Sequence, residues 1–327
     1  MGSVRIGTCS WADESLSRYW YPRGLAARER LAWYAQHFDT VEVDSTYYRL
    51  PPEEMVERWA ERTPPGFVMH VKAFGVMTRH PVKLEQLPPE LRDAAEADER
   101  GRVQRPSREL RAEVFRRFRD ALRPLREGGK LGGILLQFPS YVVFKDASFD
   151  YLRWAREQLP EELLLVEFRH RSWLDEKNRP ATLSFLEDLG AAHVIVDAPK
   201  TQARNLVPTV VARTASTAYV RFHGRNAGTW NVRGRSAAER FDYLYSDEEL
   251  REWVEPMREL ADGAEAVYAF FNNNGRSPGG GSDEDWVAQA ATNAAAFRRL
   301  LADAGVPVTR GAARGTPTGN ARTDTAV

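Results

Sequence analysis

Polar and charged side chains recur in this sequence at the C-terminal ends of apolar runs. In the stretch 163–173, LLLVEFRHRSW, the apolar run ends in Glu167 and Arg169. A buried carboxylate is costly unless it is paired, so charged groups at the end of a buried strand indicate a functional site. The other groups in such positions are Cys9, Ser10, Trp11, Glu42, Asp44, His70, Lys72, Gln137, Asp197, Arg221, His223, Asn272, Asn273 and Asn274.

The spacing of these groups indicates that several share a face of their strand. Side chains two residues apart on a strand point the same way. A single pair of this kind is explained equally well by an ordinary salt bridge, but recurrence on strand after strand is hard to explain by stability alone. The same-face pairs are Glu42 with Asp44, His70 with Lys72, Glu167 with Arg169, and Arg221 with His223.

These residue types favour acid/base chemistry without a metal. We expect Glu167 to be the leading acid/base group, with Glu42 and Asp197 as partner carboxylates. His223 is expected to move protons, because imidazole titrates near neutrality. Lys72 completes the predicted catalytic set. This chemistry suits a hydrolase or lyase.

The remaining groups are expected to bind the substrate. Arg169 and Arg221 can grip a carboxylate or phosphate through paired hydrogen bonds, so the expected ligand is a small polar, anionic molecule. Gln137 and Asn272 would position it by hydrogen bonds. The further predicted binding residues are the aromatic side chains Trp11 and Tyr47.

A divalent metal site is the first alternative. Glu167, Asp197 and His223 could hold Mg²⁺, Mn²⁺ or Zn²⁺, as in barrel isomerases and nucleases. The guanidinium groups of Arg169 and Arg221 would compete for the same carboxylates. We therefore expect no cofactor and keep a metal as the alternative.

Other chemistries are less well supported by the sequence. Lysines at strand ends neutralise carboxylates more often than they form Schiff bases, which weakens Lys72 as a nucleophile. A lone cysteine such as Cys9 is usually a small buried residue. The loop aromatic residues, together with arginine, leave a binding module for a nucleotide or single-stranded nucleic acid as a further alternative.

Composition restricts the class of protein. Of 327 residues, 43% are hydrophobic, and 46 Lys and Arg balance 46 Asp and Glu. This balance argues against nucleic acid or an anionic membrane as a general partner. The single cysteine excludes an internal disulfide and suits a reducing cytosol. With no signal peptide and no apolar run of about 18 residues, we expect a cytoplasmic protein.

The elements that must position these groups alternate along the chain. Apolar, β-branched runs predict strands at 4–9, 40–44, 67–73, 133–138, from 163, 193–197, 218–223 and 266–272. Amphipathic patterns predict helices at 27–38, 53–62, 107–126, 149–158, 181–189, 246–261 and 283–302. Ser246 to Glu249 reads as a capping box, and Gly190 as a C-terminal cap.

Eight strands, each followed by a helix, predict an α/β fold, a single-domain (β/α)₈ TIM barrel over residues 1–308. Residues 309–327 are expected to be a disordered tail. The charged connection 76–106 is either a lid or a plain insertion. Chemistry in such barrels lies at the C-terminal ends of the strands, where the groups above collect.

Several motifs of the chain resemble the YecE-like family over about residues 4–303. The matching pieces are GTCSW at 7–11, VEVDSTYYRLP at 41–51, GGILLQFP at 132–139, VEFRHRSW at 166–173, YVRFHGRN at 219–226 and FNNN at 271–274.

This resemblance implies a TIM barrel in a family of unknown function. It also implies that most of the predicted site occupies family motif positions, although Cys9 and Ser10 stand where a small residue and a glycine are expected. A thiol mechanism common to the family is therefore not expected. The residues in motif positions are Glu42, Lys72, Gln137, Glu167, Arg169, Asp197, Arg221, His223 and Asn272.

Overall fold

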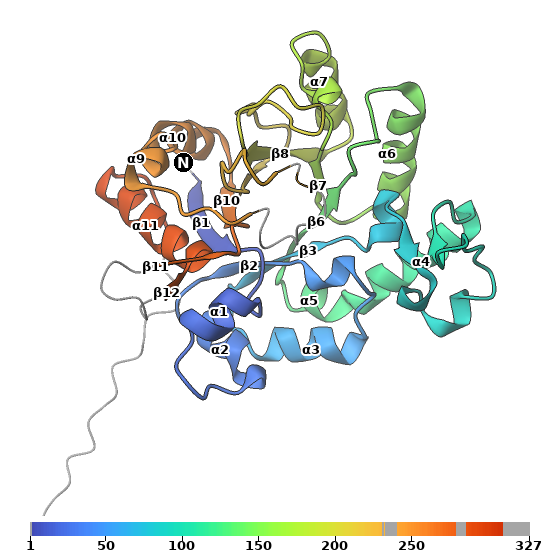
Figure 1. The fold of residues 1–327 in the computed structure, drawn as a ribbon, viewed down its shortest axis with the longest axis horizontal. Coiled ribbons are helices and arrows are strands. Elements are labelled where there is room, and N and C mark those ends of the chain that lie inside the picture. Colours follow the sequence, from blue (N-terminus) through green and yellow to red (C-terminus); the bar gives the residue numbers. More distant parts are fainter. Residues whose placement is uncertain (1, 231, 233–240, 279–285, 310–327) are drawn as a thin grey trace, which may run out of the picture.

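The protein folds as a barrel of eight parallel strands. Its structure, a computed structural model, describes residues 2–230, 232, 241–278 and 286–309. The strands follow the order β1, β10, β9, β8, β7, β6, β3, β2 around a nearly closed sheet (Figure 1). They are β1 Ser3–Thr8, β2 Thr40–Val43, β3 Val68–Lys72, β6 Leu131–Gln137, β7 Leu164–Glu167, β8 Ala191–Asp197, β9 Thr217–Phe222 and β10 Ala266–Phe271. The predicted single-domain (β/α)₈ TIM barrel is confirmed.

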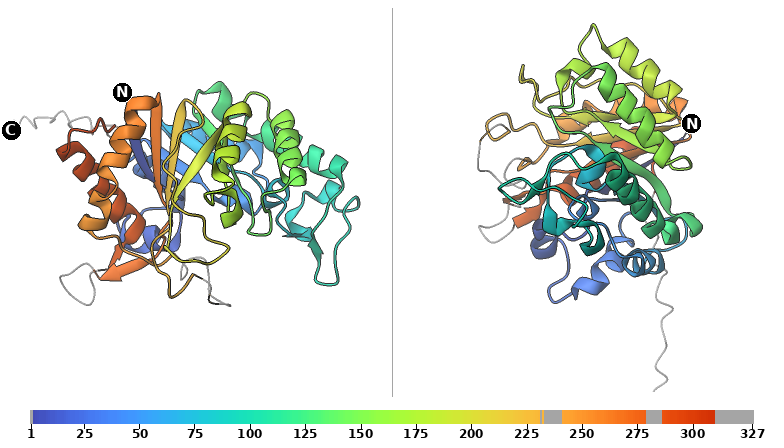
Figure 2. Two further views of the ribbon diagram at one scale, coloured as in Figure 1. Left: turned by 90° about the horizontal axis from the view of Figure 1, so that it is seen from above. Right: turned by 90° about the vertical axis from the view of Figure 1, so that its right-hand side faces the viewer.

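The helices lie outside the strands (Figure 2). Ser246 caps α9 in the predicted capping box, and Gly190 adopts φ 64° after α7. No helix within the described residues has both the length and the apolar character needed to cross a membrane. The helices are α1 Glu14–Tyr19, α2 Arg30–Tyr34, α3 Glu53–Glu61, α4 Arg108–Ala121, α5 Arg123–Glu127, α6 Asp146–Gln158, α7 Arg179–Asp188, α9 Asp247–Arg251, α10 Val254–Gly263 and α11 Gln289–Asp303.

Three predictions about the helices were wrong. The expectation that a helix follows every strand fails after β8, because residues 198–216 reach β9 through turns and extended chain. The helix expected at 27–38 is reduced to a 3₁₀ turn and α2, and α1 was not predicted. Residues 286–288, expected to be helical, form β12 Trp286–Ala288, which pairs with β11 Arg276–Pro278.

The end of the described chain is fixed to the first strand. Thr309 donates its backbone N–H to the carbonyl of Val4 at 2.9 Å, so the expected disorder does not begin at this residue. The remainder of the predicted tail, 310–327, lies outside the described residues.

The connection 76–106 is packed beside α4 (Figure 1). It contains the 3₁₀ helix η3 Gly75–Thr78 and a short hairpin of β4 Val82–Lys83 and β5 Arg102–Val103. Tyr151 of α6 donates its hydroxyl to the carbonyl of Met77 at 2.6 Å. The start of this connection is therefore attached to the body of the barrel.

Side-chain alternation divides the apolar residues into two layers. One cluster fills the barrel interior and includes Leu135, Leu165, Val194 and Phe270. A much larger cluster lies between the strands and the surrounding helices. The polar groups at the strand ends that point into the barrel, as these interior residues do, must therefore meet at its C-terminal mouth.

Gly7 allows β1 and β2 to approach closely where the barrel closes. A Cβ at this position would lie 2.4 Å from the backbone carbonyl oxygen of Thr40. We expect Gly7→Ala to lower the free energy of unfolding by about 1–3 kcal/mol, because the backbone must shift. Urea denaturation measures this. Gly228→Ala, whose Cβ would meet only the Asn226 Oδ1 at 3.5 Å, is the control. Equal stabilities of the two variants would contradict the prediction.

Candidate functional site

A buried guanidinium joins two carboxylates in the barrel interior. Arg221 of β9 is 1% exposed. Its Nη2 donates to Glu42 Oε1 at 2.6 Å, and its Nη1 pairs with Glu167 Oε2. Glu42 comes from β2 and Glu167 from β7, and both are fully buried. We call Glu42, Arg221 and Glu167 the central ion network.

Each carboxylate of this network has further partners. The Tyr219 hydroxyl donates to Glu42 Oε2 at 2.8 Å, and Gln137 Nε2 donates to Glu167 Oε1 at 2.9 Å. Arg169 Nε forms an ion pair with the same Oε1 at 2.5 Å. Burial alone would raise the pKa of Glu167, but the charges of Arg169 and Arg221 hold this pKa well below its ordinary value.

A carboxylate held in this way is permanently ionised near neutral pH. It accepts protons poorly, because a low pKa makes a weak base. In this arrangement Glu167 orients the two arginines, which differs from the acid/base role expected from the sequence.

His223 lies beside Glu167 as a neutral ring. Its Nε2 is 3.2 Å from Glu167 Oε1, and its Nδ1 is 2.9 Å from Asn272 Nδ2. Burial, followed by the charge of Arg169, lowers the pKa of His223 to about 3. The expectation that it titrates near neutrality is therefore wrong for this environment. The same Nε2 also lies 3.1 Å from Arg169 Nη2 and 3.4 Å from Arg221 Nη1, so both arginines and the carboxylate meet at this ring nitrogen.

Two groups with shifted proton affinities lie at the edge of this network. Burial raises the pKa of Asp44 to about 6, although the charge of Lys72 opposes the rise. The pKa of Lys72 is lowered, first by burial and then by Arg221. Lys72 Nζ lies 4.6 Å from the ring centroid of Tyr47. We call Asp44, Lys72 and Tyr47, with His80, the rim.

His80 reaches the rim from the loop after η3. Its ring meets that of Tyr47 edge to face at 5.1 Å, and its Nδ1 is 2.9 Å from the Thr78 hydroxyl. Burial lowers the pKa of His80 to about 3, with contributions from Lys72 and Arg169. No strand-end pattern in the sequence points to this histidine.

Aromatic residues after β9 cover the other side of the mouth. Arg169 lies over the ring of Trp230, 5.8 Å from its centroid, and Phe241 stacks on His223 at 5.4 Å. This contact separates His223 from solvent and contributes to its low pKa. Trp11 packs edge to face against Trp59 of α3 at 5.5 Å and remains partly exposed, so its expected contact with a substrate stays a prediction.

Asp197 lies on the outer face of its strand. β8 and β9 pair with Val196 beside Arg221 and Asp197 beside Phe222, so Val196 takes the interior position. The Asp197 carboxylate accepts from Arg225 at 2.7 Å, from the Tyr245 hydroxyl at 2.8 Å and from Trp253 Nε1 at 2.8 Å. It holds the segment after β9 and does not join Glu167.

The alternative metal site is therefore not assembled. Glu167 and His223 are neighbours, but Asp197 is on the opposite face of the sheet. Among the described residues, no group of three or more His, Cys, Asp and Glu side chains could hold a metal ion.

Two further strand-end groups belong to the interior packing. His70 is fully buried against Tyr268, with ring centroids 4.2 Å apart, and burial lowers its pKa to about 3. Cys9 lies 3.6 Å from Arg221 Nη2. Burial and the charge of Glu42 raise the pKa of this thiol well above its ordinary value, so it is protonated and a poor nucleophile.

Comparison with known proteins identifies the family. The family model described as "Protein of unknown function DUF72" matches residues 5–315. The chain belongs to the DUF72 family. It is 33% identical over 275 residues to the UPF0759 protein YunF of Bacillus subtilis (strain 168), covering 83% of this chain and 89% of that protein. The resemblance to a YecE-like barrel family of unknown function is confirmed.

Solved DUF72 structures share the fold. A DUF72 family protein of Thermotoga maritima MSB8 is 32% identical, covers 92% of this chain and 99% of its own, and has a TM-score of 0.70. A DUF72 family protein of Enterococcus faecalis V583 is 26% identical, covers 91% and 95%, and has a TM-score of 0.72. The barrel is thus an architecture common to this DUF72 chain and these relatives.

Removal of the central cation should strongly destabilise the protein. Arg221→Met leaves Glu42 and Glu167 buried without their shared partner, so we expect a loss of about 3–5 kcal/mol in urea denaturation. Arg116→Met, which breaks exposed ion pairs on α4, should cost no more than about 1 kcal/mol. Adding Glu42→Gln and Glu167→Gln to Arg221→Met should restore much of the loss. A single Arg221→Met variant as stable as Arg116→Met would refute the role of this network.

The raised pKa of Asp44 should make stability fall as pH rises. Because its native pKa of about 6 exceeds the unfolded value of about 3.9, the folded state binds more protons between these two values. Ionisation therefore costs up to about 2–3 kcal/mol at pH 7. Asp44→Asn should be more stable than the unmodified protein at pH 7, and this advantage should shrink toward pH 4. Asp262→Asn, on the exposed side of α10, is the matched control.

Proposed function

We propose that this DUF72 protein is an enzyme, a hydrolase or lyase, that performs acid/base chemistry on a small anionic substrate at the barrel mouth. The observation that carries the proposal is that Asp44 and Lys72 lie at the rim of the buried ion network, where each is influenced by the charge of the other. Both have pKa values moved toward neutrality, which suits groups that exchange protons during a reaction.

The central ion network supports this role because it holds buried charges in fixed positions beside the rim. Glu42 and Glu167 both accept from Arg221, and Glu42 also accepts from Tyr219. The pKa of Glu167 is held well below its ordinary value and that of His223 is lowered to about 3, so neither group needs to change its protonation near pH 7. The network provides a preorganised electrostatic environment for Asp44 and Lys72, the groups proposed to exchange protons.

Arg169 is the group best placed to hold the substrate. Its Nε is committed to Glu167, while its side chain retains 17% exposure. A carboxylate or phosphate bound here would also lie near the positive charge of Lys72. Tyr47 provides an adjacent ring surface for the rest of the substrate.

The proposed proton path uses the rim. Ionised Asp44 takes a proton from water in hydrolysis, or from a carbon acid in elimination, and protonated Lys72 supplies one to the leaving group. In this proposal Asp44 and Lys72 take the acid/base and proton-transfer roles that the sequence predicted for Glu167 and His223. Glu167 and His223 act by positioning Arg169 and Arg221.

A thermal-shift screen of carboxylated and phosphorylated metabolites tests the proposal. A true ligand at about 100 times its Kd should add about 2.7 kcal/mol of stability. We expect this shift to disappear in Arg169→Ala and Lys72→Met, and to persist in Lys83→Met, which removes an exposed lysine.

Turnover of a ligand found in this way should depend on Asp44. The rate should rise with pH through a limb near 6, because the ionised carboxylate is the active base, and Asp44→Asn should abolish this limb. If the ligand still raised the unfolding temperature of both the Arg169→Ala and the Lys72→Met variants, the mouth would not be the binding site.

A further inference from the structure

A second concentration of positive charge lies outside the barrel mouth, between α4 and α6. A hollow of about 480 Å³ is formed there by the segments 79–81, 104–111 and 141–148. Its cationic lining residues are Arg79, Arg105, Arg111 and Lys145. We call this hollow the basic groove.

The basic groove has unbalanced charge. No acidic side chain of the described residues lines it, and none of its four cations forms a salt bridge with another described residue. Farther along α4, in contrast, Arg116 pairs with Glu113 and Asp120, and Arg117 pairs with Glu113 and Glu90. Arg111 also has a buried Nε without a hydrogen-bond partner in the described structure. Four unpaired cations around one concavity favour an anionic occupant.

The floor of the groove is the first turn of α6. Lys145 is the N-cap residue of this helix, and its side chain makes no capping hydrogen bond. The N-terminal end of a helix carries partial positive charge and free N–H groups, which attract anions. The same turn also carries Asp146, which does not line the groove, and the Ser148 N–H already donates to the Lys145 carbonyl at 2.8 Å. The positive charge of the groove therefore comes mainly from its four side chains.

Ser148, in the same turn, independently points to a ligand. It is 1% exposed and lines the groove, yet its hydroxyl has no hydrogen-bond partner among the described residues. A buried hydroxyl without a partner is costly. An anion in the groove would supply the missing acceptor.

The groove is bounded by an exposed aromatic ring. Tyr141 is 56% exposed and donates its hydroxyl to the carbonyl of Arg79. Arg79 has φ 67°, a conformation that non-glycine residues adopt at a cost. The same contact thus fixes the Tyr141 ring at the edge and Arg79 in the wall.

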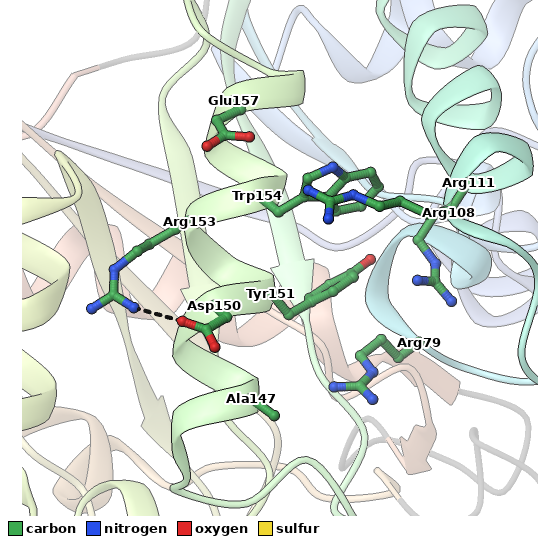
Figure 3. Close-up of a pocket in the computed structure, with 9 residues that line it drawn as sticks. All are labelled: Arg79, Arg108, Arg111, Ala147, Asp150, Tyr151, Arg153, Trp154 and Glu157. Atoms are coloured by element: carbon green, nitrogen blue, oxygen red, sulfur yellow. Dashed lines mark hydrogen bonds and ion pairs between the residues drawn. The ribbon is translucent and has the colours of Figure 1, made fainter.

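A neighbouring hollow limits the extent of the positive surface. Figure 3 shows Arg79 and Arg111 near the ring of Tyr151, and Arg108 over Trp154. This hollow also contains Asp150, paired with Arg153, and Glu157. These acids interrupt the track that a long polyanion would need, so the groove suits a compact anion.

We propose that the basic groove binds the phosphate of a small phosphomonoester. The phosphate oxygens would accept hydrogen bonds from the Ser148 hydroxyl and from the four cationic side chains of the groove, Lys145, Arg105, Arg111 and Arg79. The volume exceeds that of one phosphate, so the rest of the ligand lies toward the ring of Tyr141. This site is separate from the mouth and does not rest on the proposed enzymatic function.

Calorimetric titration of the full chain with inorganic phosphate and with AMP tests the proposal. We expect both to bind and adenosine not to bind. Lys145→Ala with Arg105→Ala should weaken binding of AMP at least about tenfold, because two charged hydrogen bonds are lost. Ser148→Ala should weaken it by about fivefold or more, with an unchanged thermal unfolding midpoint showing that the variant is folded.

Two controls and one competitor decide between explanations. Arg116→Ala, on α4 but outside the groove, and Lys72→Met, in the mouth, should leave the affinity for AMP unchanged. The proposal is overturned if neither phosphate nor AMP binds, or if the double variant binds AMP normally. It is equally overturned if either control weakens binding as much as the double variant does. A single-stranded oligonucleotide that binds with a steep salt dependence, while AMP does not, would make the groove a nucleic-acid surface instead.

Discussion

The ion pairs that Arg221 forms with Glu42 and with Glu167 are the interaction on which the barrel mouth depends. They place one positive charge between two negative ones in a space that excludes water. Ions in such a place are tolerated only with close partners and satisfied hydrogen bonds. Tyr219 and Gln137 complete those bonds. Strands β2, β6, β7 and β9 are thereby joined through their side chains as well as through the sheet.

This constraint separates the groups that hold charge from those that can exchange protons. Glu167 is paired with Arg169 and Arg221, so its charge is fixed, and His223 is buried and faces Arg169, so it remains neutral. Farther out, Asp44 and Lys72 are less completely paired and their pKa values move toward neutrality. Two buried carboxylates therefore behave differently. The pKa of Glu167 is lowered by its arginine partners, whereas the pKa of Asp44 is raised by burial.

Much of this arrangement follows from strand periodicity in the sequence. The two-residue spacing of Arg221 with His223 and Glu167 with Arg169 correctly placed them in one interior, together with Glu42, Gln137 and Asn272. Tyr219 shares the face of Arg221 and could have been found in the same way. Asp197 could not, because its direction depends on the register between β8 and β9, which no local pattern records. His80 comes from a loop, and the pKa values depend on neighbours distant in sequence.

Arg79 and His80 are consecutive residues that serve opposite sides of one short segment. Arg79 lines the basic groove, whereas His80 lies against Tyr47 at the rim. Arg79 itself has the unusual φ of 67°, and Tyr141 donates to its carbonyl. Because Arg79 and His80 share one peptide unit, the backbone conformation that places Arg79 in the basic groove also sets the position of His80 at the rim. If a ligand in the groove changed that conformation, the groove and the rim would be coupled, and the coupling free energy would be the same in both directions.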